Sequence, residues 1–203
     1  MTISVDYIVQ RLRTTRAAQE RLKDTWVWKK KTLAQWDSDI SALDDARDAY
    51  ADAVTLEDGA RGAQSEALDR LHAKTKLAVG VAKAEFADDP AVKAAFAPLT
   101  AARTSLTARV SAAQALASAW QQHAPDWEPA PGFTLADYDA LRAEVAGKRQ
   151  ALESAVATTR QKNAELGTLA KSLDKETKAW YAVATRIFPA DTAEGALLRA
   201  ELP

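Results

Sequence analysis

The chain has 203 residues and a formal net charge of −1, so its overall charge favours neither nucleic acid nor an acidic membrane surface. It contains no cysteine, which excludes disulfides, thiol catalysis and thiolate metal sites. The apolar share of 47% is ordinary for a globular protein, but 46 residues are alanine, which has the highest helix propensity of all residues. The composition therefore predicts an all-α protein.

The first part of the chain has the spacing of one long helix. No Gly or Pro occurs between Thr2 and Asp58, and apolar residues recur there at alternating steps of three and four. Such spacing, sustained over several heptads, is typical of a helix in coiled-coil-like packing. We therefore expect a helix over about residues 2–58, ended by Gly59 and Gly62.

Two shorter helices are expected between residues 63 and 123. The first ends before Pro90, which can occupy the first turn of the next helix with Asp89 as its cap. Pro98 is expected to kink or interrupt the second of these helices. Residues 124–133 then form a stiff Pro-rich connector.

A second long helix with heptad spacing is expected over about residues 134–188. Thr134 and Asp137 form an N-terminal capping pair, because the hydroxyl accepts from a backbone amide and the carboxylate suits the positive helix end. Pro189 cannot continue the helix and ends it. A short helix over residues 191–201 is expected to follow.

We expect these helices to form a single antiparallel bundle over residues 1–203. Residues 32–158 would form its bundle end, and residues 1–31 would pair with residues 159–188 in a coiled-coil-like stalk. A competing interpretation breaks each long helix in two and folds the whole chain into one compact bundle. Because two helices alone bury little surface, we expect a second copy or another helical protein to pack on the stalk.

Charge is distributed unevenly along the chain. Residues 1–31 contain eight basic and three acidic residues, whereas residues 37–58 contain one basic and eight acidic residues. This pattern is compatible with an anion-binding stalk, with head-to-tail assembly through opposite charges, or with solvated faces neutralised within the molecule. The candidate anion-binding residues are Arg11, Arg13, Arg16, Lys29, Lys30 and Lys31.

Candidate contacts with a helical partner come from three parts of the chain. Residues 104–120 contain one charged residue among small side chains, so this helix is either central in the bundle or part of a subunit interface. Aromatic residues beside the lysines or in the connector either pack in the core or are exposed for recognition. Polar residues on the seam, such as Gln19, Thr159 and Asn163, help to set the register of a coiled coil. The candidate interaction residues are Leu12, Gln19, Trp28, Ser111, Ala115, Ala119, Trp127 and Leu173.

The sequence indicates a non-enzymatic interaction or scaffold protein. No P-loop, dinucleotide fingerprint, zinc motif or nucleophile elbow is present, so we assign no catalytic residue, cofactor or metal ligand. The N-terminus lacks a signal-peptide pattern and no apolar run approaches the ~20 residues that span a bilayer, so we expect a cytoplasmic protein. A homodimer or a complex with another helical protein is expected, and nucleic acid is a less favoured partner because the chain is not basic overall. An anion-binding protein and a bundle that encloses a ligand or a metal remain as alternatives.

Overall fold

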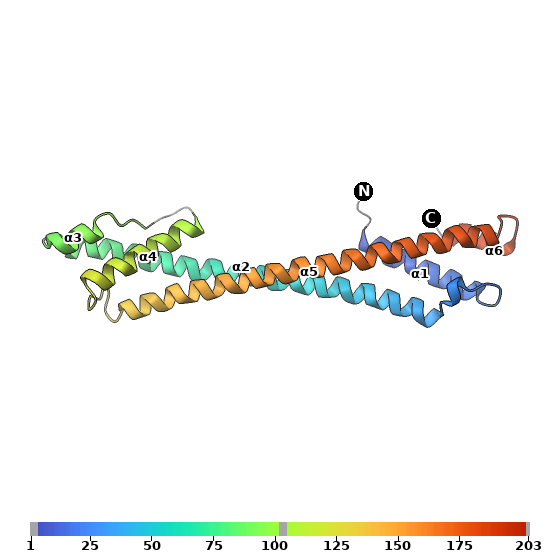
Figure 1. The fold of residues 1–203 in the computed structure, drawn as a ribbon, viewed down its shortest axis with the longest axis horizontal. Coiled ribbons are helices and arrows are strands. Elements are labelled where there is room, and N and C mark those ends of the chain that lie inside the picture. Colours follow the sequence, from blue (N-terminus) through green and yellow to red (C-terminus); the bar gives the residue numbers. More distant parts are fainter. Residues whose placement is uncertain (1–3, 102–104, 202–203) are drawn as a thin grey trace. The chain divides into compact units, whose positions relative to one another are not determined.

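The computed structural model describes residues 4–101 and 105–201, and its ribbon is drawn in Figure 1. Within these two ranges the chain forms six α-helices and one short 3₁₀ helix, with no β-strand. The predicted all-α class is therefore confirmed. The two longest helices, α2 (Leu33–Glu85) and α5 (Leu135–Ile187), contain 53 residues each.

The chain divides into two compact units. Unit 1 comprises Met1–Thr55 with Ala157–Pro203, and unit 2 comprises Leu56–Val156. Each long helix contributes one part to each unit. Each unit has its own hydrophobic core, and among the described residues these two cores have no member in common.

The single helix predicted over residues 2–58 is interrupted in the structure. α1 (Val5–Leu22) ends first, and a turn that contains η1 (Trp28–Lys30) separates it from the start of α2. The turn itself contains large apolar residues, because Trp26 is half-buried and Trp28 is buried in the core of unit 1. The periodicity of the sequence therefore does not reveal the break.

The other end of that helix also differs from the prediction. Gly59 and Gly62 do not end α2, which continues to Glu85 and so includes the segment that we expect as a separate helix. A glycine inside a helix costs only about 1 kcal/mol relative to alanine, and packing of the surrounding helix can offset that cost. Neither glycine is a sufficient stop signal without a following proline or a cap.

In unit 1, α1 lies antiparallel to the first part of α2. The Arg16 Nε lies 2.9 Å from an Asp37 carboxylate oxygen, and the Arg13 Nη2 lies 2.9 Å from an Asp44 carboxylate oxygen. Residue numbers thus rise along one helix as they fall along the other. The turn between the two helices reverses the direction of the chain.

The same reversal makes α1 parallel to the last part of α5. Arg11 pairs with Asp174 at 3.1 Å, and Gln19 accepts a hydrogen bond from Trp180 at 2.9 Å, so the numbers rise together along both helices. The predicted antiparallel pairing of residues 1–31 with residues 159–188 is therefore corrected. Three helix segments pack together here, and they do not form a two-helix stalk.

The core of unit 1 is built from α1, the first part of α2, the last part of α5, the turn between α1 and α2, and the C-terminal helix. Three of its largest members are tryptophans from different segments. Its buried members are Ile8, Val9, Leu12, Ala18, Leu22, Trp28, Trp36, Leu43, Leu166, Ala170, Leu173, Trp180, Ala184, Phe188 and Leu198.

The C-terminal helix α6 (Ala193–Glu201) matches the helix expected over 191–201. The Thr192 hydroxyl accepts a hydrogen bond from the amide of Gly195 at 3.0 Å and so caps its first turn. A Cβ atom on Gly195 would lie 1.8 Å from the carbonyl oxygen of Pro189, so the close approach at this turn requires glycine. Leu198 is fully buried and attaches the helix to the core of unit 1.

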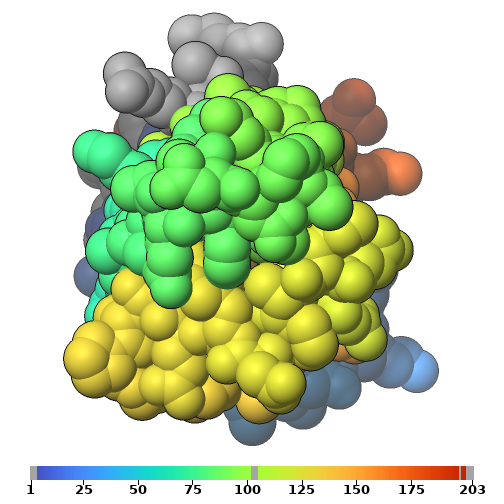
Figure 2. Space-filling view, turned by 90° about the vertical axis from the view of Figure 1, so that its left-hand side faces the viewer, coloured from blue at the N-terminus to red at the C-terminus, as the bar shows by residue number. Residues whose placement is uncertain are grey.

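Unit 2 contains the last part of α2, α3 (Pro90–Phe96), α4 (Leu106–His123) and the first part of α5. Asp89 caps α3 as predicted, because its Oδ1 accepts from the amides of Ala91 and Val92 at 3.0 and 3.1 Å. The expected interruption near Pro98 is also present, since α3 and α4 are separate helices. Figure 2 shows one end of this unit, where α3 and its neighbours (green) lie on the connector and the start of α5 (yellow).

In unit 2, α5 lies antiparallel to both α2 and α4. Thr75 of α2 and Tyr138 of α5 share a buried hydrogen bond of 2.6 Å between their hydroxyl oxygens. The rings of Trp120 and Tyr138 lie 5.7 Å apart, and Gln114 of α4 contacts Arg142 further along α5. The buried core comprises Ala67, Leu68, Leu71, Ala78, Val79, Ala82, Phe96, Ala113, Leu116, Ala117, Trp120, Trp127, Phe133, Tyr138 and Val145.

Candidate interaction groove

Unit 2 has an apolar groove between α4 and α5, over α2. Leu71, Ala113 and Val145 are buried and line the groove, which has a volume of about 230 Å³. Val110 also lines the groove, although 37% of its surface is exposed. Apolar side chains from three helices thus meet at a surface that is open to another molecule.

α4 also has an exposed, uncharged face, separate from the side that lines the groove with Val110 and Ala113. Ser111 and Ala115 are exposed and Ala119 is half-buried, whereas the buried residues of the helix lie on its opposite face. The interpretation that this helix is central in the bundle is therefore corrected, since the residues that the structure describes cover α4 on one side only. Small side chains on the free side allow another helix to approach the backbone closely.

Two arginines of α5 flank the groove. Arg142 and Arg149 both line it and lie seven residues apart, so they project from the same face of the helix. Arg142 contacts Asp139 at 2.5 Å and also Gln114, while Arg149 contacts Glu153 at 2.9 Å with 58% of its side chain exposed. A guanidinium group carries five N–H donors, so both arginines retain donors for a carboxylate of another molecule.

Trp127 does not form an exposed recognition loop. Its side chain is only 8% exposed, its indole Nε1 donates to Glu85 at 2.9 Å, and its carbonyl oxygen accepts from the Trp120 indole at 3.0 Å. The connector therefore closes one end of the core of unit 2. Of the two interpretations of this aromatic residue, the core role is the one that the structure supports.

The candidate interaction residues on the first and last helices are also buried within the chain. Leu12 and Leu173 are 0% and 4% exposed, and Gln19 and Trp28 are 1% and 6% exposed. These four side chains pack against other helices of unit 1, so they are not free to contact another chain. The expectation that they lie at an intermolecular surface is corrected.

Thr159 and Asn163, the other two polar residues predicted on the seam, lie in different environments. The Thr159 hydroxyl donates to the carbonyl oxygen of Ala53 at 3.1 Å, which joins α5 to α2 within unit 1. Asn163 is exposed and so is not on a buried seam. At Gln19 and Thr159, polar residues thus join helices within the chain.

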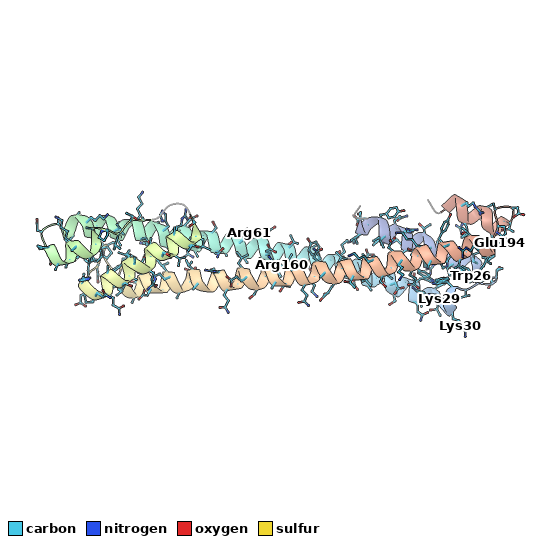
Figure 3. All side chains as sticks on the ribbon, turned by 45° about the horizontal axis from the view of Figure 1, so that its top comes forward. Trp26, Lys29, Lys30, Arg61, Arg160 and Glu194 are labelled. Carbon is cyan, nitrogen blue, oxygen red and sulfur yellow. The ribbon has the colours of Figure 1, made fainter. Side chains whose placement is uncertain are left out.

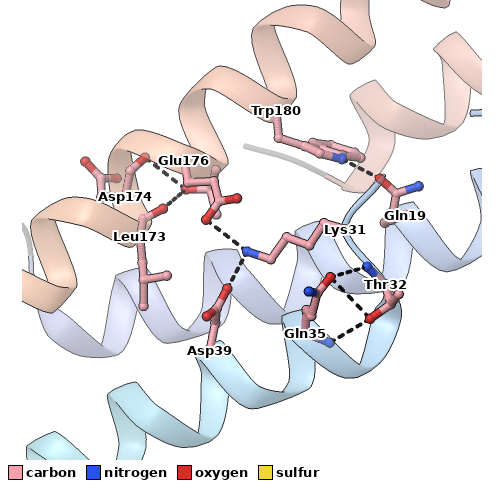
Figure 4. Close-up of polar contacts among 10 residues, drawn as sticks. Gln19, Lys31, Thr32, Gln35, Asp39, Leu173, Asp174, Glu176 and Trp180 are labelled. Atoms are coloured by element: carbon pink, nitrogen blue, oxygen red, sulfur yellow. Dashed lines mark hydrogen bonds and ion pairs between the residues drawn. The ribbon is translucent and has the colours of Figure 1, made fainter. Parts of the chain in front are cut away.

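Four of the six candidate anion-binding residues form ion pairs within unit 1. Arg11, Arg13 and Arg16 each contact an aspartate at 2.9–3.1 Å. Lys31 lies between the carboxylates of Asp39 and Glu176, as Figure 4 shows. Their positive charges are therefore largely neutralised by the chain itself.

The other two candidate residues, Lys29 and Lys30, form no ion pair with any residue that the structure describes. Both have positive φ angles, 47° and 61°, at the turn between α1 and α2, and Figure 3 shows them there with Trp26. The Lys29 Nζ lies 4.8 Å from the centre of the Trp28 ring. Two exposed ammonium groups remain, fewer than the six that the sequence predicts.

Comparison with protein-family models, with curated proteins and with solved structures finds no match to this chain. Over the described ranges, no helix is long and apolar enough to cross a membrane. Nor, in the same ranges, do three or more His, Asp or Glu side chains come together in a way that could hold a metal ion.

Sequence reasoning missed the groove residues Leu71, Val110 and Val145 together with Arg142 and Arg149. The heptad spacing of the two arginines was available as a signal, with Val145 between them. Whether these two arginines flank a groove depends on which helices pack on α5, and the sequence does not specify those helices.

Proposed function

We propose that this chain is a non-enzymatic helical interaction protein that binds an amphipathic helix of another chain in the groove of unit 2. The observation that carries the proposal is the apolar lining of Leu71, Ala113 and Val145 in a groove where Val110 is exposed. Grooves of this kind accept the apolar face of a helix, whose side chains at positions three and four apart enter it. The partner contributes the surface that would complete the packing of α4.

The charge at the rim indicates the chemistry of the partner. Arg142 and Arg149 provide two cationic groups on one face, about 10.5 Å apart along α5 for seven residues at 1.5 Å each. A docking helix with two carboxylates at the same spacing would pair with both arginines. We therefore expect a partner helix that is apolar or small on one face and acidic at its edge.

An anion-binding role for the basic residues of unit 1 receives less support. Arg11, Arg13, Arg16 and Lys31 pair with carboxylates on other helices, so an added anion would have to break ion pairs that hold unit 1 together. The ion pairs of Arg142 and Arg149 are instead with carboxylates of their own helix, three and four residues away. Two lysines at one turn give a weaker electrostatic attraction than a continuous basic surface.

The proposal is tested by a photoreactive benzoylphenylalanine in place of Val110, in the full chain. The control carries the same residue in place of Leu77, which is also apolar, exposed and in unit 2 but outside the groove. We expect cross-links from position 110 to another chain, at residues spaced three or four apart on a helix. Equal yields from both positions, or products within a single chain alone, would contradict the proposal.

A further inference from the structure

We infer that the groove of unit 2 binds the acidic face of α2 from a second copy of the same chain, so that copies assemble head to tail. This inference rests on the proposed function and names its partner. It uses two different surfaces, one in unit 2 of one copy and one in unit 1 of the next.

Two aspartates on the part of α2 that belongs to unit 1 are unpaired within the described residues. Asp45 and Asp52 are exposed on α2, and neither forms an ion pair with a residue in the described ranges. Their acidic neighbours behave differently, since Asp37, Asp39 and Asp44 each contact an arginine or a lysine. The chain thus neutralises these three carboxylates, whereas Asp45 and Asp52 project from the side of α2 away from its buried core residues Trp36 and Leu43.

The spacing of these aspartates equals that of the groove arginines. Asp45 and Asp52 lie seven residues apart on α2, as Arg142 and Arg149 do on α5. Seven residues correspond to about two turns and about 10.5 Å in both helices. Two charge pairs can therefore form at once when the helices lie side by side.

The acidic face also has the right shape for the groove. Ala49, which is half-buried, lies between Asp45 and Asp52 along α2 and next to them around the helix. This small side chain between the two charges lets the helix backbone come close to Val110 at the groove. An acidic face with bulky apolar side chains between the charges would not approach α4 as closely.

The contact that results is heterologous, because the two surfaces differ. Heterologous contacts leave one free groove and one free acidic face on a pair of copies, unless the assembly closes into a ring. Assembly beyond a dimer is therefore expected as the protein concentration rises. Added salt should weaken it, since exposed charge pairs are screened.

The test measures the mass of the purified full chain by sedimentation velocity over a series of concentrations. One variant carries Arg142→Glu and Arg149→Glu, and a second carries Asp45→Arg and Asp52→Arg. Each places like charges across the contact, so we expect each to associate at least about tenfold more weakly than the native chain. The control carries Lys171→Glu and Lys175→Glu, two exposed positions of α5 outside the groove, and should assemble as the native chain does.

Restoring the opposite charges gives a stronger test. A chain with all four reversals has complementary charges again and should recover assembly, as should a mixture of the two double variants. Arg142 contacts Gln114 and Asp139, so circular dichroism must show native helix content in each variant. If the reversal of Arg142 unfolds unit 2, Arg149→Glu alone is used in its place. It is then combined with Asp45→Arg in one chain and with Asp52→Arg in another.

Three results would overturn the inference: a native chain that is monomeric at every concentration, double variants that assemble as the native chain does, or four reversals that fail to restore assembly. The photoreactive residue at position 110 separates this failure from that of the proposed function. Cross-links to a different protein, from a chain that is itself monomeric, refute self-assembly and keep the groove as a helix-binding site. Absence of any groove-specific cross-link to another chain refutes both.

Discussion

The indole Nε1 of Trp180 donates a 2.9 Å hydrogen bond to the side-chain oxygen of Gln19, and both side chains are buried in unit 1. The same Gln19 oxygen accepts from the amide of Trp28 at 3.2 Å, and the Gln19 amide group donates to the carbonyl oxygen of Trp26 at 2.8 Å. One side chain on α1 therefore contacts both the turn that reverses the chain and the helix that α1 packs against. Figure 4 shows the contact between Gln19 and Trp180.

Replacing Gln19 by Leu should destabilise unit 1 by about 3 kcal/mol, because three buried polar groups would lose their partner. Unfolding in urea, followed by tryptophan fluorescence, measures the change in free energy. The matched control is Gln10→Ala, an exposed glutamine on the same helix, which should stay within about 0.5 kcal/mol of the native chain. A similar stability for the two variants would show that the hydrogen bonds of Gln19 contribute little.

Two glycines should respond in opposite ways to substitution by alanine. Gly195→Ala should displace α6, because the new Cβ would lie 1.8 Å from the Pro189 carbonyl oxygen. Gly167→Ala lies inside α5, where a Cβ would meet no atom within 4 Å, and should stabilise the chain by about 1 kcal/mol.

Hydrogen exchange of α6 and thermal unfolding distinguish the two glycine variants. The first variant should lose protection in Ala193–Glu201, while the second should keep it and unfold at a higher temperature. Native protection of α6 in Gly195→Ala would contradict the close packing at that turn.

Relief of backbone strain is expected at the turn between α1 and α2. Lys30 has a φ of 61°, in the left-handed region that costs a non-glycine residue roughly 1–2 kcal/mol. Lys30→Gly should therefore be neutral or stabilising by up to about 1 kcal/mol, in spite of the greater freedom of glycine in the unfolded chain. Lys30→Ala, which also removes the charge but keeps a Cβ, is the control. Chemical unfolding measures the stability of both variants. A glycine variant that is less stable than the alanine variant would contradict the prediction.

Local chemistry explains which parts of the fold were predictable. The bounds of α5 follow from a capping pair and a proline: Thr134 and Asp137 exchange hydrogen bonds at 2.9 and 3.3 Å, and the helix ends before Pro189. The hydroxyl and amide of Thr134 also lower the pKa of Asp137, as a charge-stabilising cap should. Signals of this kind act within a few residues, so the sequence alone contains them.

The break between α1 and α2 depends on contacts that are distant in sequence. The turn at Trp28 is fixed by Gln19, by the core and by Trp180 on α5, and none of these is visible as a stop signal. The groove depends in the same way on the meeting of α4 with α5. The alanine-rich helices offer many alternative pairings, so apolar spacing alone gave the helices but not their directions.

The buried hydroxyl of Tyr138 gives a prediction for alkaline pH. Thr75 has one hydroxyl proton, which it donates to the Leu71 carbonyl oxygen at 2.8 Å, so Tyr138 donates its own proton to the Thr75 oxygen at 2.6 Å. Burial is the main reason that the pKa of Tyr138 rises to about 12 from an ordinary value of 10.0. The neutral phenol is therefore favoured in the folded state.

The sign of the pH effect follows from these two pKa values. Between about pH 10 and pH 12 the unfolded chain loses the Tyr138 proton while the folded chain keeps it, so folding is favoured less as the pH rises. The contribution of this residue should be fully present below pH 10 and fall by about 1.4 kcal/mol per pH unit above it. Tyr138→Phe should cost about 1 kcal/mol near neutral pH, from the lost hydrogen bond, and should lack this alkaline slope.

The difference in unfolding free energy between the native chain and Tyr138→Phe isolates this residue, because both chains contain every other titratable group. That difference should shrink, and then change sign, as the pH rises from neutral toward 12. The comparison variant is Tyr7→Phe, which removes the same hydroxyl from a ring that is 45% exposed in unit 1. A difference for Tyr138 that stays constant with pH would mean that its hydroxyl ionises in the folded chain as easily as in the unfolded one. The buried hydrogen bond to Thr75 would then not hold the phenol in its neutral form.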